Sequence, residues 1–95
     1  MTKPLLQNET PSSWSREVVA GAYDLHVHIE PDVMRRRISD LDLARRFEEL
    51  RLGGFALKSH YVPTTERASV VRAATGVDVL GAITLNGSVG GLNAM

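Results

Sequence analysis

Strand-like and helix-like segments alternate along this chain, and the alternation limits its fold more than any other feature. Apolar stretches that suit buried strands lie at residues 22–29, 55–60 and 77–85. Amphipathic helical patterns separate them, at residues 40–52 and 64–75. Because the connections between successive elements are short, the strands are expected to be parallel and the helices to cross over between them. The sequence therefore predicts an α/β fold of about three parallel strands with two crossover helices.

Both expected crossover helices carry start and stop signals. Ser39 and Asp42 form a capping-box arrangement with a shorter acid, and Gly53 follows the apolar pattern as a stop. Residues 63–66 resemble a second helix start, which Gly76 closes. The apolar sides are expected at Leu43, Ala44, Phe47 and Leu50 in the first helix, and at Ala68, Val70 and Val71 in the second.

The N-terminal part differs from the rest. Residues 1–11 contain two prolines and few large apolar groups, so we expect a flexible leader there, followed by one domain at residues 12–95. Ser12 or Ser13 suits the cap of a short helix that Gly21 ends. The residues of this helix that are expected to pack are Trp14, Val18 and Val19.

Composition excludes several classes of function. The 95 residues include eleven basic and eleven acidic ones, which gives no electrostatic attraction to nucleic acid. A polar stretch at residues 7–10 stands where a signal peptide needs apolar residues, and no run reaches the ~18 apolar residues of a membrane span, so we expect a cytoplasmic protein without a membrane partner. Cysteine is absent, so any metal ion must bind through His, Asp or Glu.

Polar side chains gather where the expected strands end. Alternation places Asp24, His26 and His28 on one face of the first strand, with Tyr23, Leu25, Val27 and Ile29 on the other. In the second strand it separates Phe55, Leu57 and Ser59 from Ala56, Lys58 and His60. Catalytic groups in parallel α/β folds lie at the carboxyl ends of strands. The residues expected at this edge are His26, His28, Lys58, His60, Thr84 and Asn86.

Histidine is the principal metal-ligating residue type at this edge. Imidazoles two residues apart on one strand can converge on a divalent ion, and His60 from the neighbouring strand would join His26 and His28 as a third ligand. Zinc is the expected ion, with manganese or iron as alternatives. An open fourth position would hold a water whose pKa falls to roughly 7, a hydrolytic nucleophile. Asp24 is expected to orient a histidine ring as a catalytic accessory.

Basic residues near this edge suggest a small, anionic substrate. Arg35 and Arg36 are candidate substrate-binding residues, although solvation or pairing with Glu30 and Asp32 would explain the same arginines. Lys58 has three interpretations: a cation that binds substrate, a carboxylated lysine that bridges two metals, or a structural lysine that reaches solvent. Asn86 is a further substrate-binding candidate; it opens a glycine-rich stretch that suits either an anion cradle or an ordinary turn.

Three segments together carry a family resemblance over about residues 15 to 94: YDLHVHIEPD, GGFALKSHYVPT and GAITLNGSVGGLN. With them the chain resembles the amidohydrolase-like metal-dependent hydrolases, most closely an uncharacterised subgroup. The resemblance implies a (β/α)8 barrel and metal-ligand roles for His26 and His28, with attack of activated water on an amide, lactone or ester.

The metal phosphoesterases of the polymerase-and-histidinol-phosphatase type are the near rival. Their first strand also ends in His-x-His and their second commonly ends in Thr-Asp-His, where this chain has Lys58-Ser59-His60. That match implies a metal-ligand role for His60, while Ser59 departs from the expected acid.

The predicted elements account for only part of such a barrel, which needs ~250 residues. We therefore expect the N-terminal portion of a TIM-type barrel, a truncated copy in which activity is uncertain. An alternative from another class is a non-catalytic remnant or binding module that self-associates through an open sheet edge.

Overall fold

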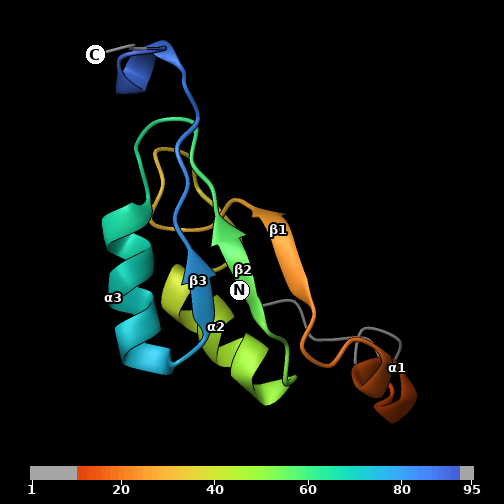
Figure 1. The fold of residues 1–95 in the computed structure, drawn as a ribbon. Helices are drawn as coiled ribbons and strands as arrows, with labels where there is room; N and C mark the ends of the chain where they lie inside the picture. Colours follow the sequence, from red (N-terminus) through yellow and green to blue (C-terminus); the bar gives the residue numbers. More distant parts are fainter. Residues whose placement is uncertain (1–10, 93–95) are drawn as a thin grey trace.

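A parallel sheet of three short strands organises the chain, for which the computed structural model describes residues 11–92. The strands are β1 (Tyr23–Val27), β2 (Gly54–Leu57) and β3 (Asp78–Leu80), and they lie side by side in chain order (Figure 1). The predicted α/β class, with three parallel strands and crossover helices, is confirmed.

Two helices, α2 (Asp40–Glu49) and α3 (Thr65–Thr75), pack against the same face of this sheet (Figure 1). The core lies between them and the strands, and in it the rings of Phe47 and Phe55 meet edge to face at 4.9 Å between centroids. The buried apolar residues are Ile29, Ala44, Phe47, Phe55, Leu57, Ala68, Val71, Val77 and Val79. Among residues 11–92, no helix is long and apolar enough to cross a bilayer.

The helix starts and stops follow the sequence signals closely. Ser39 caps α2, because its hydroxyl accepts the Asp42 N–H at 3.2 Å, and Gly76 ends α3 in the left-handed conformation at φ 78°. Helix α2 ends four residues before Gly53, however, and Gly54 belongs to β2. A Cβ at Gly54 would overlap the carbonyl oxygen of Asp78, so glycine permits the close approach of β3.

Two packing expectations are wrong. The helix α1 (Ser13–Val18) forms after a Ser12 cap but buries none of its residues, and Trp14 is 71% exposed, because α1 lies beside the sheet instead of over it (Figure 1). Val70 is 66% exposed because the buried stripe of α3 runs through Ala68 and Val71 alone. The leader expected at residues 1–11 lies, apart from Pro11, outside the described residues.

An irregularity in β1 overturns the predicted division of faces in its first half, whereas Val27 and Ile29 pack toward the core as predicted. Asp24 pairs with Phe55 and Val27 pairs with Leu57, so three steps along β1 match two along β2. This bulge places Asp24 and Val27 on the helix-covered face and leaves Leu25 68% exposed. Asp24 therefore does not share a face with the two histidines. Alternation in β2 is confirmed, because Phe55, Leu57 and Ser59 are buried.

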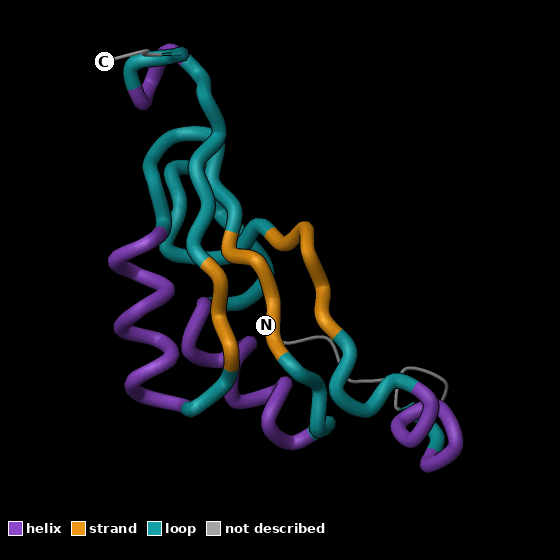
Figure 2. The backbone as a smooth tube through the Cα atoms, viewed as in Figure 1, coloured by secondary structure: helices purple, strands orange, loops and turns teal. Residues whose placement is uncertain are grey.

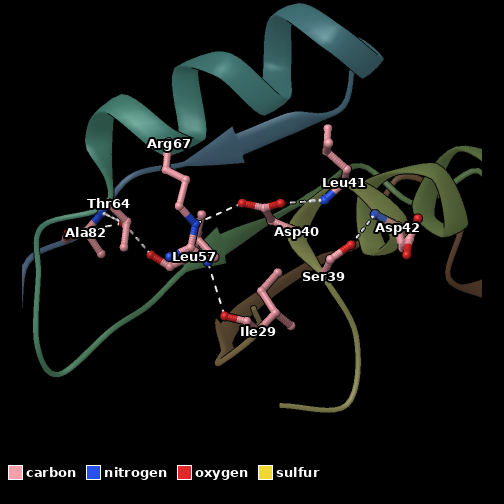
Figure 3. A network of polar contacts seen from close by, with 9 residues as sticks. All are labelled: Ile29, Ser39, Asp40, Leu41, Asp42, Leu57, Thr64, Arg67 and Ala82. Atoms are coloured by element: carbon pink, nitrogen blue, oxygen red, sulfur yellow. Dashed lines mark hydrogen bonds and ion pairs between the residues drawn. The ribbon is translucent and has the colours of Figure 1, made fainter. Parts of the chain in front are cut away.

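The third strand ends at Leu80 instead of the predicted residue 85. Beyond Leu80, the backbone N–H and carbonyl of Ala82 hydrogen-bond to Thr64 instead of to a neighbouring strand. The Thr64 N–H donates to the Ala82 carbonyl at 3.0 Å, and the Ala82 N–H donates to the Thr64 hydroxyl at 2.9 Å. The same hydroxyl donates to the Leu57 carbonyl at 2.6 Å (Figure 3). Buried Thr64 thus joins the ends of β2 and β3, and residues 81–85 continue outside the ladder.

An ion pair joins the end of β1 to both helices. The Arg67 guanidinium of α3 donates from Nε to the Asp40 carboxylate of α2 at 2.8 Å and from a terminal nitrogen to the Ile29 carbonyl at 3.1 Å (Figure 3). The other Asp40 oxygen accepts the Leu41 N–H at 2.7 Å. The side chain of Asp40 is only 9% exposed, so its charge depends on these partners.

We expect Arg67→Met to lower the free energy of unfolding by about 2–3 kcal/mol, because it leaves a largely buried carboxylate without its counter-charge. Urea denaturation measures this. Arg45→Met is the matched control, since Arg45 pairs with Asp42 at 3.7 Å with both side chains 65% exposed, and it should cost at most about 0.5 kcal/mol. Equal losses in the two variants would contradict the structural role of the Arg67 pair.

A second link crosses the sheet on its other face. The Tyr23 hydroxyl donates to the Asp78 carboxylate across Gly54, and this hydrogen bond raises the pKa of Tyr23, with desolvation and the Asp78 charge acting in the same direction. Because the folded-state pKa exceeds that of the unfolded chain, the bond stabilises the fold fully below pH 10 and ceases to do so as pH rises through the folded pKa.

Asp78→Asn should therefore lower the pKa of Tyr23 relative to the parent protein. Ultraviolet titration of tyrosinate, in a Tyr61→Phe background that leaves Tyr23 as the titrating phenol, measures the change. An unchanged titration midpoint would show that Tyr23 and Asp78 are not paired in solution.

Candidate functional site

The loops that leave the carboxyl ends of the three strands gather at one end of the sheet (Figure 2). His26 lies near the end of β1, His28 directly follows it, and His60 lies three residues beyond β2. The His28 ring lies 5.3 Å from the His26 ring and 5.0 Å from the His60 ring, centroid to centroid. The chain thus brings together the three imidazoles that the sequence placed at neighbouring strand ends.

His28 is the central imidazole and the most desolvated. Its Nδ1 is buried and has no hydrogen-bond partner among the described residues. Burial lowers the pKa of His28, and the nearby His60, Arg36, His26 and Lys58 lower it further. The ring is therefore neutral at pH 7, the form in which imidazole binds a metal ion.

The arrangement of the rings fits a metal site in donor type and spacing. Two imidazoles on one tetrahedral zinc ion, with metal–nitrogen distances of about 2.1 Å, have centroids roughly 5.2 Å apart. The observed distances of 5.3 and 5.0 Å agree with this. Ring orientation differs, because His28 and His60 stack at 16° and their in-plane lone pairs do not converge. Accordingly, no three His, Cys, Asp or Glu side chains within residues 11–92 are arranged to hold an ion, and binding requires side-chain rotation.

Asp24 supports the main chain of the site, not an imidazole. Its carboxylate accepts the His26 N–H at 3.0 Å, which stabilises the bulge. On the helix-covered side it lines a shallow hollow with Phe47 and Leu52. Within residues 11–92, Asp24 bonds to the backbone of His26 and to no imidazole, so its predicted role in orienting a histidine ring is not observed.

Lys58 lies between the histidine-bearing segments. Its N–H donates to the Val27 carbonyl at 3.0 Å, which extends the pairing of β1 with β2 by one step. Alternation places the Lys58 side chain opposite buried Leu57 and Ser59, on the same side as His60, and it is only partly exposed. The structure thus brings Lys58 to the imidazoles, as the sequence predicted.

The three arginines at residues 35–37 differ in their contacts: the middle one is paired, and its two neighbours are exposed. Arg36 donates from Nε to Asp32 at 2.9 Å, and its N–H donates to the Glu30 carboxylate at 3.3 Å, whereas Arg35 and Arg37 are exposed. Burial acts to raise the pKa of Asp32, but the Arg36 hydrogen bond and the Val33 N–H outweigh it, so the pKa lies below its usual value. Pairing within the loop, the alternative interpretation of the arginines, therefore holds for Arg36.

The glycine-rich segment contacts the backbone of His60. Asn86, the predicted substrate-binding residue, donates from Nδ2 to the His60 carbonyl at 2.9 Å, and the Ser88 hydroxyl donates to the same oxygen at 2.8 Å. Ser88 lies in the short 3-10 helix η2 (Gly87–Val89) and was not predicted from the sequence. The sequence feature that could have indicated Ser88 is its position in the Asn-Gly-Ser turn. Thr84 is partly buried near this segment.

Replacing Asp24 with Ala removes the acceptor for the His26 N–H, so we expect hydrogen exchange of that amide to accelerate roughly threefold to tenfold. Asp24→Asn keeps a carbonyl acceptor and should exchange more nearly like the parent. NMR-detected exchange resolves the individual amide. Equal exchange in all three proteins would show that the bulge does not depend on the Asp24 carboxylate.

Comparison with known proteins assigns the chain to a family whose function is unknown. Residues 21–95 match a protein family described as a family of unknown function, DUF6282. No curated protein and no solved structure matches the chain significantly.

Proposed function

The chain belongs to the DUF6282 family, and we propose that it contributes the histidine half of a metal-dependent hydrolase centre of the amidohydrolase-like type. His26, His28 and His60 would hold one divalent ion, with zinc as the expected metal. The observation that carries this proposal is the buried Nδ1 of His28, which has no hydrogen-bond partner among the described residues. The centroids of two other imidazoles lie 5.3 and 5.0 Å from that of His28, the separation expected for two imidazoles on one zinc ion.

An unpartnered buried nitrogen needs a physical explanation. Buried polar atoms in native proteins nearly always have a partner, because leaving one unpaired costs about 1–3 kcal/mol. A metal ion would satisfy Nδ1 of His28, and the lowered pKa of His28 removes the competing proton. A purely structural histidine would be expected to have a hydrogen-bond partner instead.

The residues of this edge have separable tasks in the proposed reaction. When bound, a divalent ion acts as a Lewis acid and lowers the pKa of water. Asp24 fixes the backbone of His26, and the Asn86 and Ser88 side chains fix the backbone of His60. These hydrogen bonds position the backbone of two of the three proposed ligands. Residues that contact the ligands but not the metal commonly orient the ligands in this way.

Ser59 favours the hydrolase over the phosphoesterase alternative. Its side chain is 2% exposed and points away from the imidazoles, with its hydroxyl accepting the Tyr61 N–H at 3.1 Å. The position that is commonly acidic in the phosphoesterases thus offers no carboxylate to a second ion. A centre with one metal ion is the simpler expectation.

Zinc binding to the metal-free protein tests the ligand set directly. We expect saturable binding in competition with a chromophoric chelator, and His28→Ala should weaken it by more than about 10-fold, since loss of outer-shell partners alone reaches that scale. Arg45→Met, on the exposed face of α2, should bind zinc like the parent. Absence of binding, or equal binding by His28→Ala, would overturn the proposal.

A separate assay tests the reaction. Zinc-loaded and metal-free protein would be compared on a panel of small carboxylate-bearing amides, lactones and esters, with chromatographic detection of the hydrolysis products as the readout. Hydrolysis that requires zinc and is lost in His28→Ala is the expected result. Zinc binding without turnover of any bond class would restrict the chain to metal binding.

A further inference from the structure

Lys58 is a partly buried cation at this edge, and no carboxylate described in residues 11–92 pairs with it. Its side chain is only partly exposed, and within residues 11–92 it makes no ion pair. Lysines that are withdrawn from water are usually paired, because desolvating an ammonium group is costly. The four ion pairs in this part of the chain lie elsewhere, in Arg36–Asp32, Arg45–Asp42, Arg46–Glu49 and Arg67–Asp40.

The nearby acids are already engaged. Asp32 bonds to Arg36 at 2.9 Å, and Asp24 accepts the His26 N–H on the far side of the bulge. Glu30 accepts the Arg36 N–H. No acidic side chain described in residues 11–92 therefore pairs with Lys58.

The backbone holds Lys58 where a ligand at the imidazoles would meet it. The hydrogen bond from the Lys58 N–H to the Val27 carbonyl places Lys58 beside the segment that carries His28. Alternation directs its side chain to the side of His60. The Asn86 amide, which lies 3.4 Å from Nδ1 of His60, adds a polar group at the same edge.

We propose that Lys58 binds an oxyanion of the substrate, a carboxylate or a phosphate group, beside the three imidazoles. An ammonium group is a compact point charge that suits either anion. As a statement about the substrate of the hydrolase, this inference rests on the proposed function, whereas the anion site itself depends on Lys58 alone. A divalent ion held by neutral imidazoles would increase the positive charge and reinforce the preference for an anionic substrate.

Titration of metal-free protein with inorganic phosphate and with acetate tests the anion site without a metal that could bind the anion itself. Histidine ring resonances in NMR spectra report binding, and we expect saturable shifts of His28 and His60. Lys58→Met should weaken binding at least about 10-fold, Lys58→Arg should largely retain it, and Arg45→Met should leave it unchanged. Tighter binding of phosphate would identify a phosphoryl substrate, and tighter binding of acetate a carboxylate.

The outcomes separate this inference from the proposed function. Anion binding that is absent, or equal in parent and Lys58→Met, overturns the role of Lys58 even if zinc binds. Zinc binding that fails while Lys58-dependent anion binding persists overturns the hydrolase centre and leaves the anion site. Thermal melting of each variant confirms that a lost signal is not lost folding, and retention in Lys58→Arg gives the same assurance independently.

Discussion

The contact of Arg67 with Asp40 and Ile29 holds this small structure together at the end that carries the proposed site. One guanidinium, 20% exposed, joins the start of α2, the first turn of α3 and the carbonyl that follows His28. Without it, a largely buried carboxylate would lose its counter-charge and the Ile29 carbonyl would lose this hydrogen bond. The polar contact therefore fixes the loop after β1 against two helices that the apolar core places only approximately.

Thr64 links the ends of the other two strands, β2 and β3, in a similar way. Its hydroxyl is shared between the carbonyl of Leu57 and the N–H of Ala82, so the segments that follow β2 and β3 leave the sheet together. His60 lies on the first of these segments and Asn86 on the second, and Asn86 reaches back to the His60 carbonyl. The proposed metal and anion sites thus depend on side-chain-to-backbone bonds at strand ends more than on the strands themselves.

Much of this architecture could be predicted from local patterns. The Ser39 cap, the Gly76 stop and the buried alternation of Phe55 and Leu57 involve neighbours within a few residues, and all three are present. The faces of the first half of β1 could not be predicted, because the bulge arises from pairing with a strand thirty residues away. The prediction that Trp14 packs in the core was wrong for a related reason. An amphipathic pattern shows that a helix has an apolar side, but it does not show that another element lies against that side.

By itself, the sequence determined the parallel α/β order, the absence of cysteine ligands and the gathering of three histidines and Lys58 at one sheet edge, because parallel strands must end on the same side. Only the tertiary structure decided that Asp24 supports a backbone amide, that Arg36 is bound by Asp32 and that Lys58 has no carboxylate partner among residues 11–92. Which acid pairs with which base depends on distances of a few ångströms between segments far apart in the chain, and spacing along the sequence does not contain those distances.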